Sequence, residues 1–339
     1  PSGIYNLMTF DWRMDRESPP LIKCLAGVGA ICAQPELALK AFQDHPNPWG
    51  FGYDFMFRNE QDYPYIFMLG RCVIILIASL GGFVLFKFAA RVYGYQGGLF
   101  VLFLYVFNPN IIAHARLVTI DMGATAAILL SVYFFWRFLK TPGFKAAGVS
   151  GMVLGVAQLC KFTALILFPI FCLIYALSFL RRSLPGPEGK PRSITKHIGY
   201  IGFLFALSML VINAGYLFSG SFSPLGSYGF ESNLLQKIQG LFWNEFLVPL
   251  PYDYLAGFDT QLAISQGGNP FYEGYLMGEH STEGWRHYFL IAFVVKNPAV
   301  LCLLLICVGI LWIMDKDNRP DFQTGLCIWL PMAVFFTYF

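Results

Sequence analysis

Charged residues are scarce in this sequence. Asp, Glu, Lys and Arg make up 13% of its 339 residues and hydrophobic residues make up 56%, whereas a soluble domain averages about 25% charged residues. This deficit excludes an ordinary soluble domain and indicates a polytopic membrane protein. The formal net charge is only +3, and no basic stripe with interleaved aromatic residues is present, so the sequence predicts no nucleic-acid partner.

The eight cysteines include no Cys-x-x-Cys pair. Metal-site and disulfide spacings are therefore absent, and we expect small apolar packing residues at these positions. The sequence also lacks solenoid repeats and an inverted pair of interrupted helices, which argues against a transporter. It shows no signal peptide, and because it begins with Pro1 and stops inside the apolar run 328–339, we expect both ends to be truncated.

Long apolar runs predict an all-α bundle of membrane-spanning helices. We expect spans at 65–86, 97–113, 117–138, 146–160, 163–180, 198–218, 298–313 and 325–339. The spans 146–160 and 163–180 form a hairpin with Lys161 at its tip. The predicted division is an outward loop with juxtamembrane helices (1–64), a transmembrane helix bundle (65–219), a second outward loop (220–296) and C-terminal transmembrane helices (297–339).

Prolines mark two short helices within the first predicted loop. Pro19 and Pro20 precede the apolar stretch 21–32, and Pro35 precedes 36–42. Because proline is favoured in the first turn of a helix, each stretch predicts a helix, the first apolar enough to lie along the membrane. Residues 45–50 are predicted to form a loop.

Basic residues predict the orientation. The loops that follow positions 86, 138, 180 and 313, together with Arg137 at the end of the span 117–138, carry 12 of the 23 Lys and Arg residues. These loops fall on one side if each span crosses once, and the positive-inside rule makes that side the cytoplasm. Residues 1–64, the turn 114–121, Lys161 and 220–296 then face outward, with the active side on the outer face of the cytoplasmic membrane.

The stretch 108–122 places His114, Arg116 and Asp121 between two apolar runs. A carboxylate costs roughly 2.5–3.5 kcal/mol at the centre of a membrane helix and less near the surface. If a helix begins near residue 113, His114 and Asp121 lie about 20° from the same face, with Thr125 one turn further. Such a group could hold a phosphate or sugar at the membrane surface. The alternative is a hydrogen-bonded helix start whose charged groups reach the headgroups.

Four segments resemble a known family. Residues 11–23 (DWRMDRESPPLIK) are similar to its "NPEHPPLxK" segment, and 109–121 (PNIIAHARLVTID) to "PNxxAHxRLVTTD". Residues 155–163 (GVAQLCKFT) are similar to "GLAxLTKFT", and 275–298 (YLMGEHSTEGWRHYFLIAFVVKNP) to "YLLGExSxxGWWYYFxxAFLxKTP". The family is the protein O-mannosyltransferase and aminoarabinose-transferase superfamily of GT-C glycosyltransferases, and in particular its bacterial phospholipid-carrier-dependent members. The chain departs from it at Ser18, where histidine is common, and at Ile120, where threonine is common.

The resemblance implies a GT-C helix bundle that moves a sugar, with inversion, from a polyprenyl-phosphate donor to an acceptor protein or lipid. A carboxylate base must accept the proton of the attacking acceptor. The family's acidic pair is expected upstream of Pro1, so Asp121, Asp15 and Glu17 are the catalytic candidates in this sequence. Fixed cations or donors would meet the negative charge on the leaving phosphate. The predicted donor-binding residues are His114, Arg116, Lys161, Glu279, His280 and Arg286.

Each of these residues also has a structural interpretation. Lys161 could reach the lipid headgroups, Lys23 and Lys296 would be interfacial anchors, and Glu279 and His280 could form a solvated turn. We expect Asp253 and Asp259 to be solvated. No cofactor is predicted. His114 and Asp121 could share a divalent cation, but two ligands are too few to predict a metal site.

Two alternatives to the enzyme stay open. A family member that has lost catalysis would serve as a membrane scaffold or accessory subunit of a larger complex, which Ser18 and Ile120 favour weakly. A transporter or lipid flippase predicts charges or broken helices in mid-membrane. None is visible in 65–86, 122–135 or 298–313, which argues against that class.

Overall fold

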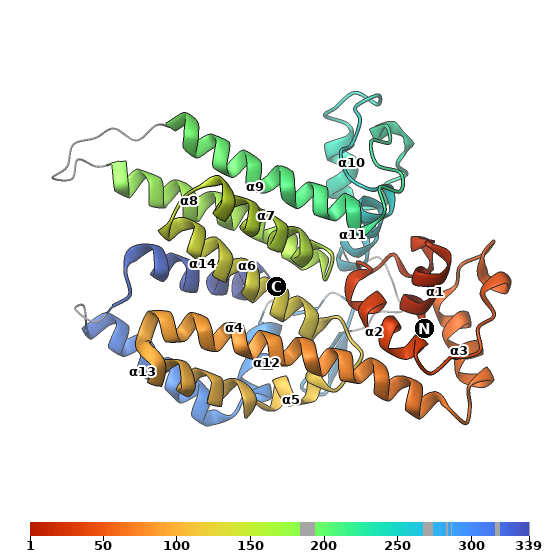
Figure 1. Cartoon of the computed structure of the whole chain (residues 1–339), viewed down its shortest axis with the longest axis horizontal. Helices are drawn as coiled ribbons and strands as arrows, with labels where there is room; N and C mark the ends of the chain where they lie inside the picture. The colour runs from red at the N-terminus through yellow and green to blue at the C-terminus, as the bar shows by residue number, and fades with distance from the viewer. Residues whose placement is uncertain (184–193, 267–273, 283, 286, 316–318, 339) are drawn as a thin grey trace.

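The computed structural model describes residues 1–183, 194–266, 274–282, 284, 285, 287–315 and 319–338, and it confirms a mostly helical polytopic membrane fold. Within these residues, four helical stretches are long and apolar enough to cross a membrane, or five if one bent pair counts as a single span. The four stretches are Tyr63–Val106, Asp121–Lys140, Phe162–Arg181 and Thr195–Gly215. Figure 1 shows the bundle helices lying side by side, with a smaller group of helices at one end.

The first two predicted spans form one continuous element, α4 (Tyr63–Val106), that folds back on itself at Gly94. The backbone of Gly94 has φ 76° and ψ 172°, a conformation that glycine adopts readily and other residues rarely do. The two limbs then lie side by side, because the hydroxyl of Tyr105 in the second limb donates to the carbonyl of Ala78 in the first at 2.8 Å. The predicted return of the chain near residue 97 is therefore confirmed.

The bundle core lies around α6 (Asp121–Lys140), which packs against α4 and against α7 (Phe144–Gln158). Phe135 of α6 stacks on Phe171 of α8 (Leu167–Ser183) with ring centroids 3.9 Å apart, and both rings are fully buried. α7 also packs closely on α9 (Ile194–Gly215): a Cβ on Gly151 would lie 2.3 Å from the carbonyl oxygen of Leu204. These contacts fix the end of the hairpin that carries Lys161.

Residues 1–64 were predicted to form the first outward region. They contain α1 (Ser2–Thr9), the 3₁₀ helix η1 (Trp12–Asp15), α2 (Leu21–Ile31), the 3₁₀ helix η2 (Leu39–Phe42) and α3 (Pro48–Arg58). α2 confirms the predicted helix at 21–32 and packs against α1 and α4. The predicted helix at 36–42 is wrong except for η2. The predicted loop at 45–50 is wrong at its end, because the Asn47 side chain caps the amides of Trp49 and Gly50 and Pro48 begins the helix.

The segment 220–296, predicted as a long loop, contains ordered elements. They are the 3₁₀ helix η4 (Leu225–Ser227), α10 (Asn233–Gln239), α11 (Tyr252–Ser265), the antiparallel strands β1 (Gly274–Leu276) and β2 (Glu279–Ser281), and α12 (Tyr288–Lys296). Met277 and Gly278 join the strands with φ 49° and 99°, as a tight hairpin turn requires.

The chain ends with α13 (Ala299–Met314) and α14 (Phe322–Tyr338). α12 and α13 form a pair bent by 114°, either a broken span or a re-entrant loop. This break was not predicted. It follows from Pro298, because the residue before a proline is pushed out of the helical region, and Asn297 is extended at φ −105° and ψ 149°.

Candidate functional site at one end of the bundle

The stretch 114–121 is a turn between two helices, which confirms the turn predicted between the spans 97–113 and 117–138, and no single helix runs from residue 113 through Asp121. α5 (Pro109–Ala115) begins at an Asn108 cap, whose side chain accepts from the amides of Asn110 and Ile111, and α6 begins at Asp121. The two predicted residues still come close, with His114 Nδ1 at 3.9 Å from Asp121 Oδ2, too long for a hydrogen bond. Arg116 is exposed at the end of α5.

Asp121 meets Lys161 across the tips of two separate hairpins. Lys161 lies between α7 and the 3₁₀ helix η3 (Phe162–Ile166), and its ammonium donates to Asp121 Oδ1 at 2.9 Å. Both side chains stay partly exposed, Lys161 at 35% and Asp121 at 42%. An ammonium has three donors, so the Lys161 group that binds Asp121 can also bind an anion that approaches from outside the protein.

A cavity of about 660 Å³ opens beside this pair. Lys161, Phe162 and Thr163 form one wall together with Ile120, and Thr260 and Gln261 of α11 form another. The first outward region supplies the remaining wall, which consists of residues 13–19 with Pro48 and Trp49. The cavity therefore joins parts of three segments that lie far apart in the sequence, and it includes the predicted residues Asp15 and Glu17.

Aromatic packing explains why these segments meet. Trp12 of η1 lies edge-on to Tyr216 at 5.5 Å between ring centroids, and Phe162 lies 5.3 Å from Tyr254 of α11. Tyr216 and Tyr254 are 5.9 Å apart, so the rings form one buried cluster. Burying such rings contributes about 1.5–3 kcal/mol each. The cluster ties η1, the Lys161 tip and α11 together beneath the cavity.

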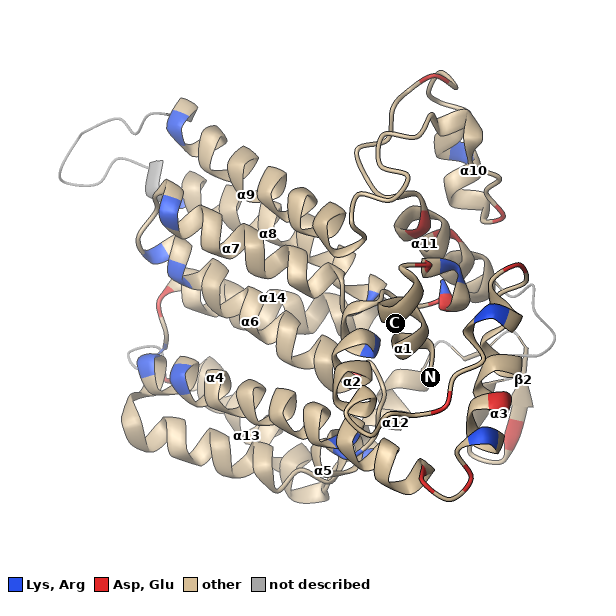
Figure 2. Ribbon diagram, turned by 45° about the vertical axis from the view of Figure 1, so that its right-hand side comes forward, with Lys and Arg blue, Asp and Glu red and all other residues tan. Residues whose placement is uncertain are grey.

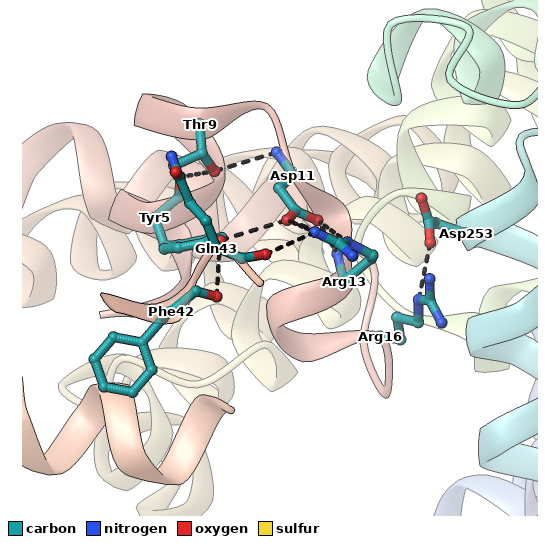
Figure 3. A network of polar contacts seen from close by, with 8 residues as sticks. All are labelled: Tyr5, Thr9, Asp11, Arg13, Arg16, Phe42, Gln43 and Asp253. Atoms are coloured by element: carbon teal, nitrogen blue, oxygen red, sulfur yellow. Dashed lines mark hydrogen bonds and ion pairs between the residues drawn. The ribbon is translucent and has the colours of Figure 1, made fainter. Parts of the chain in front are cut away.

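Two arginines of the cavity wall are each held by an aspartate (Figure 3). Arg13 donates through Nη2 to Asp11 Oδ2 at 2.7 Å and to the carbonyl of Gln43 at 2.9 Å. Burial acts to raise the pKa of Asp11, but the hydrogen bonds from Arg13 outweigh it and hold that pKa below its ordinary value. Arg16 donates through Nε to Asp253 of α11 at 2.8 Å.

Asp253 and Asp259 were both predicted to be solvated, and both predictions are wrong. The side chain of Asp253 is 12% exposed, and burial raises its pKa although Arg16 acts in the opposite direction. Asp259 is 4% exposed and accepts from the amides of Glu231 and Ser232 and from the Ser232 hydroxyl. Both aspartates hold the second outward segment in place.

Lys23 was predicted to be an interfacial anchor, and this prediction is wrong. Its side chain is only 10% exposed. The ammonium donates to the backbone carbonyls of Asp15 at 2.7 Å and Ser18 at 2.8 Å, and it lies 3.0 Å from Asp15 Oδ2. Asp15 is thus engaged by Lys23 from behind the cavity wall, whereas Glu17 is an exposed residue of that wall.

Comparison with known protein families decides what kind of bundle this is. Residues 68–216 match the family model described as dolichyl-phosphate-mannose-protein mannosyltransferase. This stretch, somewhat less than half of the chain, is similar to that family. The family is a GT-C family of lipid-carrier glycosyltransferases, which confirms the resemblance. No curated protein and no solved structure matches the chain.

The mannosyltransferase-family match includes Asp121 and Lys161 but not the first outward region or the second outward segment. Arg13, Arg16, Thr260 and Gln261 also lie on the cavity, and the sequence analysis did not select them. The two arginines lie in the segment 11–23 that resembles the family, and their positive charge could have marked them as candidates for binding an anion. Thr260 and Gln261 gave none, because only the packing of α11 brings them to the cavity.

The other predicted donor-binding residues lie away from this cavity or outside the described residues. Glu279 and His280 are exposed on β2, where the His280 ring lies 5.2 Å from that of Tyr275. The carbonyl of Lys296 accepts from the Asn110 side chain, which joins α12 to α5. Arg286 lies outside the described residues. The described part of the chain shows no group of three or more His, Cys, Asp or Glu side chains that could hold a metal ion.

Proposed function

We propose that this protein transfers a sugar from a polyprenyl-phosphate donor to an acceptor at the outer face of the cytoplasmic membrane. The observation that carries the proposal is the contact between Asp121 and Lys161 beside a cavity of about 660 Å³. Both residues lie within the part of the chain that is similar to a family of lipid-carrier glycosyltransferases. The family supports the chemistry, and the position of the pair supports the place where it occurs.

The cavity suits an anionic headgroup. Lys161, Arg13 and Arg16 all line it, and each is oriented by an aspartate, so little rearrangement is needed when an anion enters. Asp121 begins α6, and Lys161 lies between two bundle elements, so a lipid could keep its chain in the bilayer while its phosphate reaches Lys161. We propose that Lys161 binds the donor phosphate and that Asp121 orients its ammonium.

In the proposed reaction, the acceptor nucleophile forms a bond to the anomeric carbon while the bond from that carbon to the phosphate oxygen breaks. The acceptor's proton passes to a carboxylate base, and the lipid phosphate leaves with an added negative charge. A preorganised cation stabilises that developing charge more than it stabilises the ground state. Lys161 therefore contributes both to donor binding and to the rate of the transfer step.

The distribution of charge supports the proposed orientation. Figure 2 shows Lys and Arg at both ends of the bundle, whereas most of the acidic residues lie at the end around α3 and α11, so the end where α9 begins is the more basic one. The positive-inside rule assigns the basic end to the cytoplasm. The cavity then opens on the outer face, where lipid-linked donors would meet secreted or surface acceptors.

The test uses the purified protein in liposomes with radiolabelled polyprenyl-phosphate sugars. We expect release of the lipid phosphate with transfer of the sugar, and we expect Asp121→Asn to reduce turnover by roughly a hundredfold. Asp321→Asn is the matched control, because it removes the ion pair with Lys140 beyond the other end of α6. If none of the donors is turned over, the proposal is contradicted and a membrane scaffold or accessory subunit is favoured.

A further inference from the structure

The wall of the cavity that carries Arg16 and Glu17 is a turn with little regular structure of its own. η1 ends at Asp15, and α2 does not begin until Leu21. Pro19 and Pro20 fill the end of the connection, and proline has no backbone N–H with which to stabilise a turn. A segment of this kind needs side chains to fix it.

Lys23 provides that support from the first turn of α2. Its ammonium directs hydrogen bonds to both ends of the turn, at the carbonyl oxygens of Asp15 (2.7 Å) and Ser18 (2.8 Å). The Asp15 carboxylate, 3.0 Å away, balances its charge, and the Ser18 hydroxyl lies 3.5 Å from the same carboxylate. The four groups close the turn around one buried cation.

Burying this lysine is costly unless its contacts compensate. Burial lowers the pKa of Lys23, and the Asp15 carboxylate acts in the opposite direction. The three donors of the ammonium are taken up by the Asp15 carboxylate and by two backbone carbonyls of the turn that lines the cavity, so the contacts that compensate the burial also hold this turn. On the other side, α11 presses on the same turn, since a Cβ on Gly257 would lie 2.2 Å from the Arg16 carbonyl oxygen.

We propose that Lys23 is a positioning residue of the transferase site: through the Asp15 and Ser18 carbonyls it clamps the turn that presents Arg16 and Glu17 to the cavity. This inference rests on the proposed function for its effect on turnover. The clamp itself is a statement about the backbone of residues 15–18 and is measured without any substrate. Lys23 touches neither the cavity nor, in the proposed reaction, the reacting atoms.

Two variants separate the clamp from the buried ion pair. Lys23→Met removes both carbonyl bonds and leaves the Asp15 carboxylate uncompensated. Lys23→Met combined with Asp15→Asn also removes the bonds but leaves no unpaired buried charge, so we expect its thermal stability to recover toward that of the wild type. Asp15→Asn alone keeps both carbonyl bonds. Lys40→Met is the control for loss of an exposed lysine elsewhere in the first outward region.

The first measurement is hydrogen–deuterium exchange of peptides that cover residues 12–20. We expect faster exchange than in the wild type for Lys23→Met and for the double variant, and wild-type protection for Asp15→Asn and Lys40→Met. If the double variant regains both stability and protection, Lys23 is only a charge partner and the proposal is overturned. This result stands whether or not the protein proves to be a glycosyltransferase.

The second measurement is sugar transfer by the same variants. We expect the double variant to lose at least about tenfold in kcat with donor KM within about threefold of the wild type, because Lys161 is untouched. The kcat of Asp15→Asn should exceed the kcat of the double variant by about tenfold. Equal loss in these two variants would assign the effect to the Asp15 carboxylate and contradict the clamp. If the wild type is inactive, the proposed function is contradicted. The hydrogen–deuterium exchange measurement still tests the clamp.

Discussion

The ammonium of Lys161 lies 2.9 Å from the carboxylate of Asp121, forty residues earlier in the chain. The two residues stand at the ends of different helical hairpins, and both remain partly exposed beside the same cavity. An exposed ion pair contributes only about 0–1 kcal/mol to stability. Stability alone is therefore a weak reason for this pair, and the anionic headgroup of the proposed donor gives it a role that an ion pair for stability would not have.

Removing the Lys161 ammonium should impair transfer more than folding. We expect Lys161→Met to lower kcat/KM for a polyprenyl-phosphate sugar by roughly a hundredfold, because one fixed cation at the leaving phosphate is lost, while the melting temperature stays near the wild-type value. Steady-state kinetics in liposomes measure the effect, with Lys145→Met, an exposed lysine of α7, as control. Equal kinetics in wild type and Lys161→Met would remove Lys161 from the donor site.

Gly257 should resist replacement because α11 approaches the Arg16 backbone there. A Cβ at this position would lie 2.2 Å from the Arg16 carbonyl oxygen, so α11 or the turn must move. Overpacking of this kind typically costs about 1–3 kcal/mol, and we expect a lower melting temperature for Gly257→Ala. Gly229→Ala is the control, since a Cβ there meets no atom within 4 Å. A melting temperature unchanged by Gly257→Ala would show that this contact is loose.

Asp11 should make stability depend on acid pH. Its pKa in the folded protein lies below the ordinary value of 3.8, because the Arg13 hydrogen bonds outweigh the effect of burial. A lowered folded-state pKa gives a contribution to stability that is full above the unfolded-state pKa and is lost as pH falls through the folded-state value. We expect the melting temperature of the wild type to fall more steeply than that of Asp11→Asn below about pH 4. Parallel curves would exclude this contribution.

The sequence predicted those parts of the fold that depend on local pattern. Apolar runs located the bundle helices, and the hairpin with Lys161 at its tip is present. Alternation of the spans predicted that Lys161 and the 114–121 stretch share one end of the bundle, and the Asp121 contact agrees with that prediction. The turn between α5 and α6 was predicted, but the second helix begins at Asp121 and not at residue 117, because residues 117–120 (LVTI) are too apolar to signal a turn by composition.

The remaining errors concern contacts between distant segments. Lys23, Asp253 and Asp259 were interpreted as exposed because charged residues usually are. Each is instead buried by a partner that sequence spacing does not reveal, such as Arg16, which lies 237 residues before Asp253. The cavity likewise depends on Thr260 and Gln261, which reach it only because the Trp12, Tyr216 and Tyr254 rings draw α11 onto the first outward region.

The most direct test of the whole account is equilibrium binding of polyprenyl phosphate, compared with the uncharged polyprenol of the same length, to the purified protein. We predict that wild type binds the phosphate more than about tenfold more tightly than the alcohol, and that Lys161→Met abolishes this difference without weakening binding of the alcohol. Equal affinity of the wild type for both lipids would contradict the claim that the cavity beside Asp121 and Lys161 receives an anionic lipid headgroup.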